Sequence, residues 1–457
     1  MNIQSLLGYK DLTDTIIYQH DKQISLQQFI SDLNYLDQII PDHHYVLNLF
    51  ENRYYFLLGL LLGIKRNSIH LFPSNTSPYT LEYLEKQYTS ILVLNNTDPG
   101  LKQSSFINIE QLLQEKKTVD NISLSLDDVF NQEFFDEKRV IIFTSGSTGE
   151  PKPFSKNWSD FIGVARQLVQ PMALQHKPMI LATVPAQHMY GLETSIIMPL
   201  VNGLSIYDER PFYPEDIKVI LAAQKNSSLL ITTPVHIRAC LKTKVILPYL
   251  HAALSATAPL DCSMAKVFED KQNTSLFEIY GCTEVGVIAI RQPAVEKYWS
   301  CLADIELKKS TDDEYYINTQ RSIENFVLND YISGVRNNCF LLNGRKADII
   351  NIAGKRTSLS YLNHHLLNHK DIIDGCFYQP ENSDESQQRL MVFIVADKNQ
   401  LTIKQLKNYL KIKIDTVFLP RRVYFIKQLP RNKTGKILYN DIKSLYQDVH
   451  SSRNYAG

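Results

Sequence analysis

The stretch VIIFTSGSTGEPKP, from Val140 to Pro153, indicates the fold of this chain. It opens with a β-branched and aromatic run that predicts a buried strand over residues 140–144, and a loop of small, hydroxylated and glycine residues follows. Glycines let the backbone approach an anion, hydroxyl groups donate hydrogen bonds to it, and a lysine adds charge. The pattern fits neither GxxxxGK[ST] nor GxGxxG, and an ordinary turn is the alternative. We predict a phosphate-binding loop with the ligands Thr144, Ser145, Gly146, Ser147, Thr148, Gly149 and Lys152.

Short β-branched runs alternate with longer amphipathic stretches along the chain, and this predicts an α/β fold with largely parallel sheets. Besides residues 140–144, we expect strands and helices at the positions that follow. The strands are 45–50, 90–94, 180–184 and 229–232, and the helices are 79–88, 160–168 and 214–224. The apolar run 54–64 is too short to span a bilayer and predicts a buried helix, so no membrane span is expected.

A domain boundary is predicted near residues 344–348, because the chain after it has the pattern of a compact α+β unit. In that unit we expect helices at 359–368 and 403–412 and strands at 391–396 and 423–426. The predicted domains are 1–346, large and N-terminal, and 347–457, small and C-terminal. The second carries 17 basic and 10 acidic residues, which suits an anionic ligand held between the domains or an ordinary solvated face.

The composition excludes several classes of protein. The 457 residues are 44% hydrophobic, enough for a sizeable core, and the 48 basic residues balance the 48 acidic ones. This balance argues against a chain that coats nucleic acid or an anionic membrane. The six cysteines form no CxxC pair and have no metal-ligand spacing with histidine, and the N-terminus lacks a signal peptide pattern. We therefore expect a cytoplasmic protein with reduced thiols.

The segment TSGSTGEPKP resembles the phosphate loop of the adenylate-forming superfamily, which includes acyl- and aryl-CoA synthetases, luciferases and the adenylation domains of peptide synthetases. Further matches follow in that superfamily's order and cover essentially the whole chain. They are YGCTEVG (280–286), Asp330 followed by Gly344-Arg345 and Gly354-Lys355-Arg356, and LPRNKTGKI (429–437). The resemblance implies a large domain with mixed or parallel sheets and flanking helices, and a small mobile lid.

The resemblance also implies roles for individual residues. Thr283 would contact the α-phosphate of ATP, and Glu284 would hold Mg²⁺, a cation that prefers oxygen ligands. Asp330 would accept the ribose hydroxyls, with Arg345 nearby and Arg356 facing the phosphate or ribose. Lys436 would be the catalytic cation that bridges the attacking carboxylate and the α-phosphate.

The chain departs from the superfamily's pattern at two of these places. Leu328 and Asn329 replace the first two residues of the usual TGD, which leaves a plain surface carboxylate as the alternative for Asp330. Ala347 occupies a hinge position that is commonly Asp or Lys. Hinge rotation is still expected, but its control is not defined by the sequence.

The segment PAQHMYG (185–191) resembles the superfamily's PxxHxxG, so His188 and Tyr190 are candidates for the acid pocket, with a core role as the alternative. Tyr280 and Gly281 are further candidates. Ala256 and Thr257 stand where acyl-CoA synthetases often have two glycines, and they should narrow the pocket. No Phe-Asp pair for binding an amino group is present, only Glu193, so an amino acid substrate is not expected.

The resemblance implies that a carboxylic acid is activated with ATP and Mg²⁺ to an acyl-adenylate, and that a thiol then takes the acyl group. We expect a hydroxybenzoate-like aryl acid or a short to medium acyl acid. The acceptor would act in trans, either CoA or the phosphopantetheine of an acyl carrier protein, and the basic C-terminal domain suits both. The main alternative is a non-catalytic nucleotide-binding or carrier-docking protein of the same fold, and a luciferase-type oxygenase is a further one.

Overall fold

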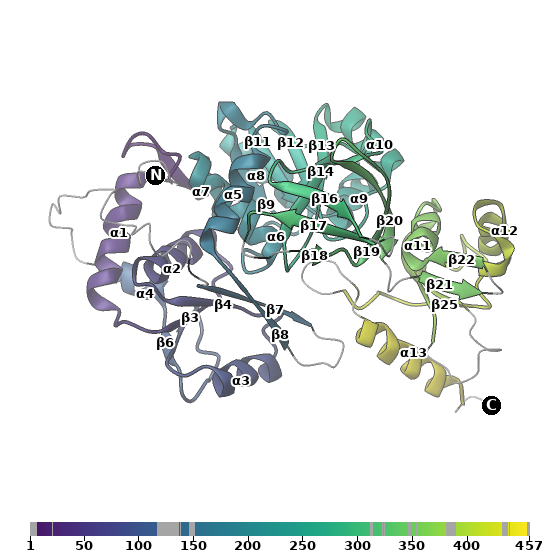
Figure 1. Ribbon diagram of the computed structural model, residues 1–457, viewed down its shortest axis with the longest axis horizontal. Coiled ribbons are helices and arrows are strands. Elements are labelled where there is room, and N and C mark those ends of the chain that lie inside the picture. Colours follow the sequence, from purple (N-terminus) through teal and green to yellow (C-terminus); the bar gives the residue numbers. More distant parts are fainter. Residues whose placement is uncertain are drawn as a thin grey trace.

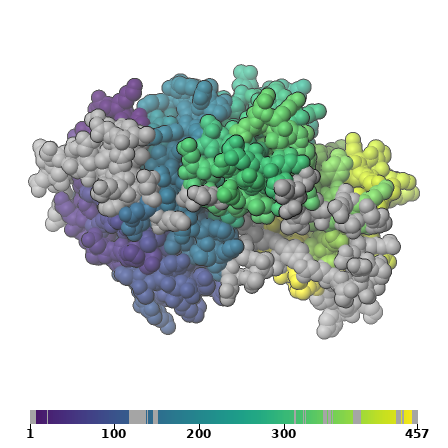
Figure 2. Space-filling model, in the orientation of Figure 1, coloured from purple at the N-terminus to yellow at the C-terminus, as the bar shows by residue number. Residues whose placement is uncertain are grey.

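The computed structural model describes residues 7–454 except 21, 117–136, 138, 146–150, 311–313, 322, 324, 346–348, 353–354, 381–389, 432–436 and 438. Figure 1 shows a large body of purple, blue and green segments and a smaller, mostly yellow unit at one end. Figure 2, in the same orientation, shows the yellow residues at the end opposite the purple ones. The predicted α/β class with a large N-terminal and a small C-terminal domain is confirmed. The predicted boundary between residues 346 and 347 lies outside the described residues and stays a prediction.

The larger sheet of the body has eleven strands among the described residues. Their order is β19 (Asp330–Arg336), β20 (Cys339–Arg345), β15 (Trp299–Cys301), β14 (Gly286–Arg291), β13 (Ser275–Cys282), β12 (Leu250–Ser255), β11 (Ser228–Thr232), β9 (Met179–Ala182), β10 (Ile206–Tyr207), β1 (Thr15–Tyr18) and β2 (Gln23–Ser25). Pairing is parallel from β1 through β13 and antiparallel from β13 to β19. The carboxyl ends of β9, β11, β12 and β13 therefore meet at one edge.

A second sheet has six strands in the described part of the chain. Their order is β6 (Ser105–Ile107), β5 (Ile91–Leu94), β3 (Tyr45–Asn48), β4 (Ile69–Phe72), β7 (Val140–Ser145) and β8 (Pro151–Lys156). All pairs are parallel except the hairpin of β7 and β8. The predicted strands 45–50, 90–94 and 140–144 are confirmed, with ends that differ by one or two residues. The sequence did not predict β8, because its two prolines cannot donate to a strand ladder; β8 lies at the sheet edge, where prolines are tolerated.

Helices cover these sheets, and several begin where the sequence predicts. Pro78 and Pro214 occupy the first turns of their helices, where a missing amide costs nothing, and Ser77 caps the first of these helices. The predicted buried helix 54–64 is confirmed as α2, in which nearly every side chain is buried. The helices of the body are α1 (Leu26–Ile39), α2 (Arg53–Lys65), α3 (Pro78–Gln87), α4 (Ile109–Gln114), α5 (Trp158–Leu168), α8 (Pro214–Gln224), α9 (Pro234–Thr243) and α10 (Cys262–Gln272).

The polypeptide between β9 and β10 forms one continuous helical stretch with a change of pitch. It begins as α6 (Met189–Gly191), widens into the π-helix η5 (Leu192–Ile197) and returns to α-helix in α7 (Met198–Asn202). Every residue of η5 is buried. A π-helical turn places side chains at positions that a regular helix cannot reach, and such turns are frequent at functional sites.

The C-terminal unit has its own apolar core. Leu362, Leu366, Leu406 and Leu410 are fully buried in it. Its elements are β21 (Ile349–Ile352), β22 (Lys355–Ser358), α11 (Leu359–Leu367), β23 (Ile372–Tyr378), β24 (Met391–Ala396), α12 (Ile403–Lys413), β25 (Arg422–Phe425) and α13 (Tyr439–Asn454). The two helices and two strands predicted for this unit are confirmed.

A three-stranded sheet, β16 (Ile305–Lys309), β17 (Tyr315–Thr319) and β18 (Phe326–Val327), lies in the body. Among the described residues, we find no helix with the length and apolarity that crossing a membrane requires.

Burial strongly perturbs a histidine of the six-stranded sheet. His70 of β4 is 1% exposed and packs edge-on against Trp158, with ring centroids 5.3 Å apart. Neither ring nitrogen has a hydrogen-bond partner among the described residues. Burial lowers the pKa of His70 to about 3, because the charged form cannot be solvated there.

This burial predicts an acid sensitivity that His70→Phe should reduce. Between pH 6.5 and about 3, the unfolded chain binds a proton at His70 that the folded chain excludes. The free energy of unfolding from this group therefore falls as the pH falls, by up to about 1.4 kcal/mol per pH unit. Urea unfolding of both proteins from pH 7 to pH 4 should give a shallower pH dependence for the variant. Equal slopes would contradict this assignment.

Candidate functional site

The predicted phosphate loop connects β7 to β8 across a hairpin. Thr144 is half-buried and pairs with Lys152 in the ladder, and Ser145 pairs with Pro151. Lys152 is exposed, with its Nζ 5.3 Å from the centroid of the Phe154 ring. The hairpin therefore brings the two ends of the predicted loop together. Four of the predicted ligands lie outside the described residues: Gly146, Ser147, Thr148 and Gly149.

The segment YGCTEVG forms the connection between β13 and β14. The two strands are antiparallel, with Cys282 opposite Gly286, so Thr283 and Glu284 lie in the tight turn between them. Gly286 has a φ of +90°, a conformation that favours glycine. Because β13 pairs in parallel with β12, this turn lies at the edge where parallel strands of the large sheet end, the usual place for a ligand in α/β folds.

The candidate pocket residues follow the same strand ends. Tyr190 donates hydrogen bonds from its hydroxyl to the backbone oxygens of Thr232 (3.1 Å) and Leu254 (2.7 Å), so it joins the ends of β11 and β12. Burial raises the pKa of Tyr190 well above its usual value. His188 is half-buried and immediately precedes α6.

The segment after β12 is constrained. Ala256 is 7% exposed, and Thr257 has a φ of +79°, a strained conformation for a β-branched residue. The Oγ of Ser255 is buried without a hydrogen-bond partner in the part of the chain that the structure describes. Backbone strain of this kind is common at ligand sites.

Asp330 lies close to the same turn although fifty residues separate it from Tyr280. The hydroxyl of Tyr280 donates to Oδ2 of Asp330 at 2.5 Å, which ties β13 to the first residue of β19. Gly281 is exposed beside Tyr280. The Cα of Arg345 is the partner of Asp330 across the β19–β20 hairpin, so the two residues that the sequence singled out are neighbours.

The remaining predicted residues are Arg345, Arg356, Lys436 and Ala347. Arg345 in β20 and Arg356 in β22 have described backbones, and Arg356 pairs with Asn351, but their side chains lie outside the description. Lys436 and Ala347 lie outside the described residues altogether.

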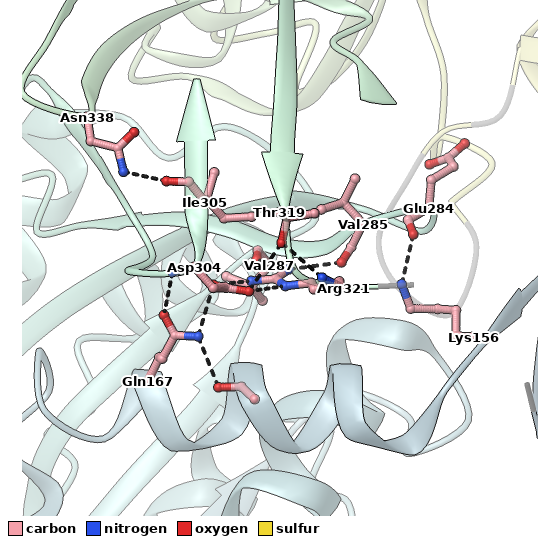
Figure 3. Close-up of polar contacts among 11 residues, drawn as sticks. Lys156, Gln167, Glu284, Val285, Val287, Asp304, Ile305, Thr319, Arg321 and Asn338 are labelled. Carbon is pink, nitrogen blue, oxygen red and sulfur yellow. Dashed lines mark hydrogen bonds and ion pairs between the residues drawn. The ribbon is translucent and has the colours of Figure 1, made fainter. Parts of the chain in front are cut away.

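Charged side chains that no sequence motif indicated are buried behind the Thr283–Glu284 turn (Figure 3). Lys156 of β8 is 2% exposed and donates to the backbone oxygen of Glu284 at 2.8 Å. Arg321 donates from Nη1 to the backbone oxygens of Val285 (2.9 Å) and Val287 (2.7 Å). Three backbone oxygens of the turn and of β14 are thus bound by two cations.

Carboxylates balance these cations. Asp304 accepts from Nε of Arg321 at 2.6 Å and from its Nη2 at 2.9 Å. Glu193 of η5 is 2% exposed, and burial raises its pKa to about 7 against the opposing charges of Lys156 and Arg321. Burial also lowers the pKa of Lys156. The charges of two buried cations therefore act on Glu193. That the substrate is not an amino acid stays a prediction.

Glu284, the predicted metal ligand, suits a metal ion that binds together with the phosphates of a nucleotide. Among the described residues, no three histidine, cysteine or carboxylate side chains gather into a preformed metal site. Glu284 supplies one carboxylate, and Mg²⁺ is commonly held by one or two carboxylates together with substrate phosphates. Figure 3 shows this carboxylate on the side of the turn away from Lys156.

The chain is similar in sequence to known proteins. Residues 92–308 match the family described as AMP-binding enzyme, and residues 364–436 match the AMP-binding enzyme C-terminal domain. A 4-coumarate–CoA ligase from Halorhodospira halophila is 26% identical over 298 residues, which are 64% of this chain and 73% of that protein. The human mitochondrial malonate–CoA ligase ACSF3 is 21% identical over 387 residues, covering 68% of this chain and 66% of that one.

The fold has solved counterparts as well. The o-succinylbenzoate coenzyme A synthetase MenE from Bacillus subtilis, in complex with AMP, superposes with a TM-score of 0.79 at 15% identity. The match covers 96% of this chain and 97% of that one. At this identity the likeness concerns the fold.

The turn should be sensitive to a single methyl group at Gly286. An ideal Cβ there would lie 2.6 Å from Oε1 of Glu193, whereas one at Gly100, with a φ of +78°, would meet nothing within 4 Å. Gly100→Ala should cost about 1–2 kcal/mol for its backbone conformation alone. Gly286→Ala should cost about 1–3 kcal/mol more, because the bound carboxylate must be displaced. Urea unfolding measures both, and equal losses would mean that Glu193 moves aside freely.

Proposed function

Because the chain belongs to the family of AMP-binding enzymes, we propose that it is an ATP-dependent carboxylic acid ligase, which forms an acyl-adenylate and then a thioester. The observation that carries this proposal is the position of Thr283 and Glu284. They lie in a turn at the carboxyl edge of the parallel strands, next to the bond between Tyr280 and Asp330. Thr283, Glu284 and Asp330 therefore lie together at one edge of the sheet, although they are far apart in the sequence.

In the first step a carboxylate oxygen attacks the α-phosphorus of ATP, and pyrophosphate leaves. Thr283 binds the α-phosphate, and the loop from Ser145 to Lys152 binds the β- and γ-phosphates through amides, hydroxyl groups and the lysine charge. Glu284 would hold Mg²⁺, and the bound cation would supply charge neutralisation for the departing pyrophosphate. Lys436 offsets the repulsion between the two anionic reactants.

Asp330 is well placed for the ribose. A carboxylate accepts from two vicinal hydroxyl groups, as acidic residues do in other nucleotide sites. The bond from Tyr280 holds one of its oxygens, which orients the carboxylate and leaves lone pairs on the other oxygen for the sugar. This anchoring supports Asp330 as a ligand despite the altered residues Leu328 and Asn329 before it.

In the second step a thiol attacks the acyl carbon and AMP leaves. The C-terminal unit would rotate between the steps, as a lid. A described contact with the body joins His364 Nε2 of α11 to Asp261 Oδ2 at 3.1 Å, and the histidine is well exposed. Such a contact contributes little stability and would not prevent rotation. The acceptor is CoA or the phosphopantetheine of an acyl carrier protein, and the basic charge of the unit suits both.

The pocket supports an aryl acid or a short to medium acyl acid. Ala256 and Thr257 replace small flexible residues at the end of β12, and Thr257 is held in a strained conformation. Side chains at these positions reduce the space beyond the carboxylate, which disfavours a long chain.

Acid-dependent exchange between pyrophosphate and ATP tests the proposal directly. We expect exchange with some members of a panel of benzoates, cinnamates and fatty acids of increasing length, and a decline for long chains. ATP binding without exchange for any acid would favour the non-catalytic alternative.

A variant of the pocket tests in the same assay whether Thr257 limits the length of the acid. Thr257→Gly should extend exchange toward longer acids without abolishing it, because it removes the side chain and relieves the strained φ. An unchanged length profile would remove Thr257 from the pocket.

Lys436→Ala should separate the two half-reactions. Adenylation should slow by about a hundredfold or more, because an electrostatic contact to the transition state is lost. Thioester formation from supplied acyl-AMP should stay near the wild-type rate. The control is Lys433→Ala in the same segment, which should affect neither step. Equal losses in both half-reactions would assign Lys436 a different role.

A further inference from the structure

The buried charges behind the Thr283–Glu284 turn are the feature of the molecule that the proposed function does not use. Lys156 and Glu193 are each 2% exposed, and the side chain of Arg321 is 3% exposed. Removing such groups from water is costly, and hydrophobic residues of similar volume often give equal or greater stability. A purely structural role for these three charged side chains would therefore cost free energy that apolar residues would not.

What these side chains bind is specific. Lys156 binds the backbone oxygen of Glu284, and Arg321 binds those of Val285 and Val287. The carboxylate of Glu193 packs against Gly286 at the start of β14, where an added Cβ would lie 2.6 Å from its Oε1. The turn and the start of β14 are thus held by ionic side chains from three separate segments, namely β8, η5 and the chain before β18.

The direction of the Lys156 bond matters for Glu284. In Figure 3 the backbone oxygen of Glu284 points toward Lys156, and its carboxylate extends from the opposite side. A peptide plane is rigid, so fixing its oxygen restricts the direction in which the neighbouring side chain leaves the backbone. An ammonium donor also forms a stronger hydrogen bond than a neutral one.

Lys156 also connects two parts of the predicted ATP site. It is the last residue of β8, the strand that follows the phosphate loop, and its partner lies 128 residues further along the chain. A displacement of β8 relative to the turn would change the distance between the β- and γ-phosphate ligands and the metal ligand. Small misplacements of this kind are costly for catalysis.

We propose that Lys156 is a positioning residue, which holds the carboxylate of Glu284 in the orientation required for magnesium-bound ATP and keeps the turn in register with the phosphate loop. Arg321 and Glu193 hold the far end of the same turn. The inference rests on the proposed function for the role of Glu284, but the contact that it invokes can be tested without catalysis.

The experiment compares Lys156→Met with Lys177→Met in the full chain. Lys177 donates to the backbone oxygen of Gly8 at 3.2 Å, so the control removes a bond of the same kind on the surface. Amide hydrogen exchange of a peptide covering residues 282–290 reports on the turn. We expect at least tenfold faster exchange in this peptide for Lys156→Met and no change for Lys177→Met.

A second readout concerns the metal. Wild-type protein should bind ATP more tightly with Mg²⁺ than with EDTA, measured by calorimetry. In Lys156→Met this enhancement should fall at least tenfold, while ATP binding in EDTA changes less than threefold. In the exchange assay kcat should fall more than KM for the acid rises, because the acid pocket is intact.

The double variant Lys156→Met/Glu193→Gln separates positioning from charge neutralisation. It removes two opposite buried charges that act on one another, so the protein should keep its fold even where the single variant is unstable. If the turn still exchanges rapidly and the Mg²⁺ enhancement is still lost, the positioning role stands. If both return to wild-type values, Lys156 merely neutralises Glu193 and the inference is overturned.

Two further outcomes are decisive. Unchanged exchange of residues 282–290 in Lys156→Met would overturn the inference whatever the activity. Absence of acid-dependent activity in the wild type would end the proposed function, but faster exchange and a lost Mg²⁺ enhancement in the variant would still support the positioning role of Lys156.

Discussion

Parallel pairing of β9, β11, β12 and β13 is the constraint on which the candidate site depends. Parallel strands that are neighbours end at the same edge, so whatever follows each strand is brought together there. The antiparallel turn from β13 to β14 then reverses the chain at that edge and presents Thr283 and Glu284. The same antiparallel half of the sheet brings Asp330 to Tyr280 and to Arg345. Strand pairing, together with the side-chain hydrogen bond from Tyr280 to Asp330, therefore assembles residues that come from distant parts of the sequence.

Much of this architecture could be predicted from the sequence because its signals are local. The buried strand 140–144, the apolar helix α2 and the proline-led helix α8 each follow from patterns within a dozen residues. The strand β8 could not be predicted, since Pro151 and Pro153 argue against a strand unless its place at a sheet edge is known. The resemblance implies that Arg345 lies near Asp330, and the β19–β20 hairpin gives the physical reason, because it makes them cross-strand partners.

Lys156, Glu193 and Arg321 show why the rest of the site could not be predicted. A lysine in PKPFSK or an arginine before β18 has no motif, and each acts on backbone atoms far away in the sequence. Burial of the charges is itself a result of tertiary packing. The sequence did contain one indirect signal, the single acidic residue Glu193 where an amino-group ligand would otherwise be expected. The structure explains it, because this buried carboxylate balances the charges of Lys156 and Arg321.

A tight turn whose side chains bind a ligand must meet two opposing requirements. The side chains must be accessible to the ligand, and the backbone must be held in one conformation. Under the proposed function, Thr283 and Glu284 must remain accessible to a nucleotide, so side chains cannot pack over them to fix their position. Both requirements are met because the backbone oxygens of the turn face the protein interior. Lys156 and Arg321 bind these oxygens without covering the side that faces the ligand. Charged donors suit this task, since their hydrogen bonds are strong and directional, and the cost of burying them is offset by Glu193 and Asp304.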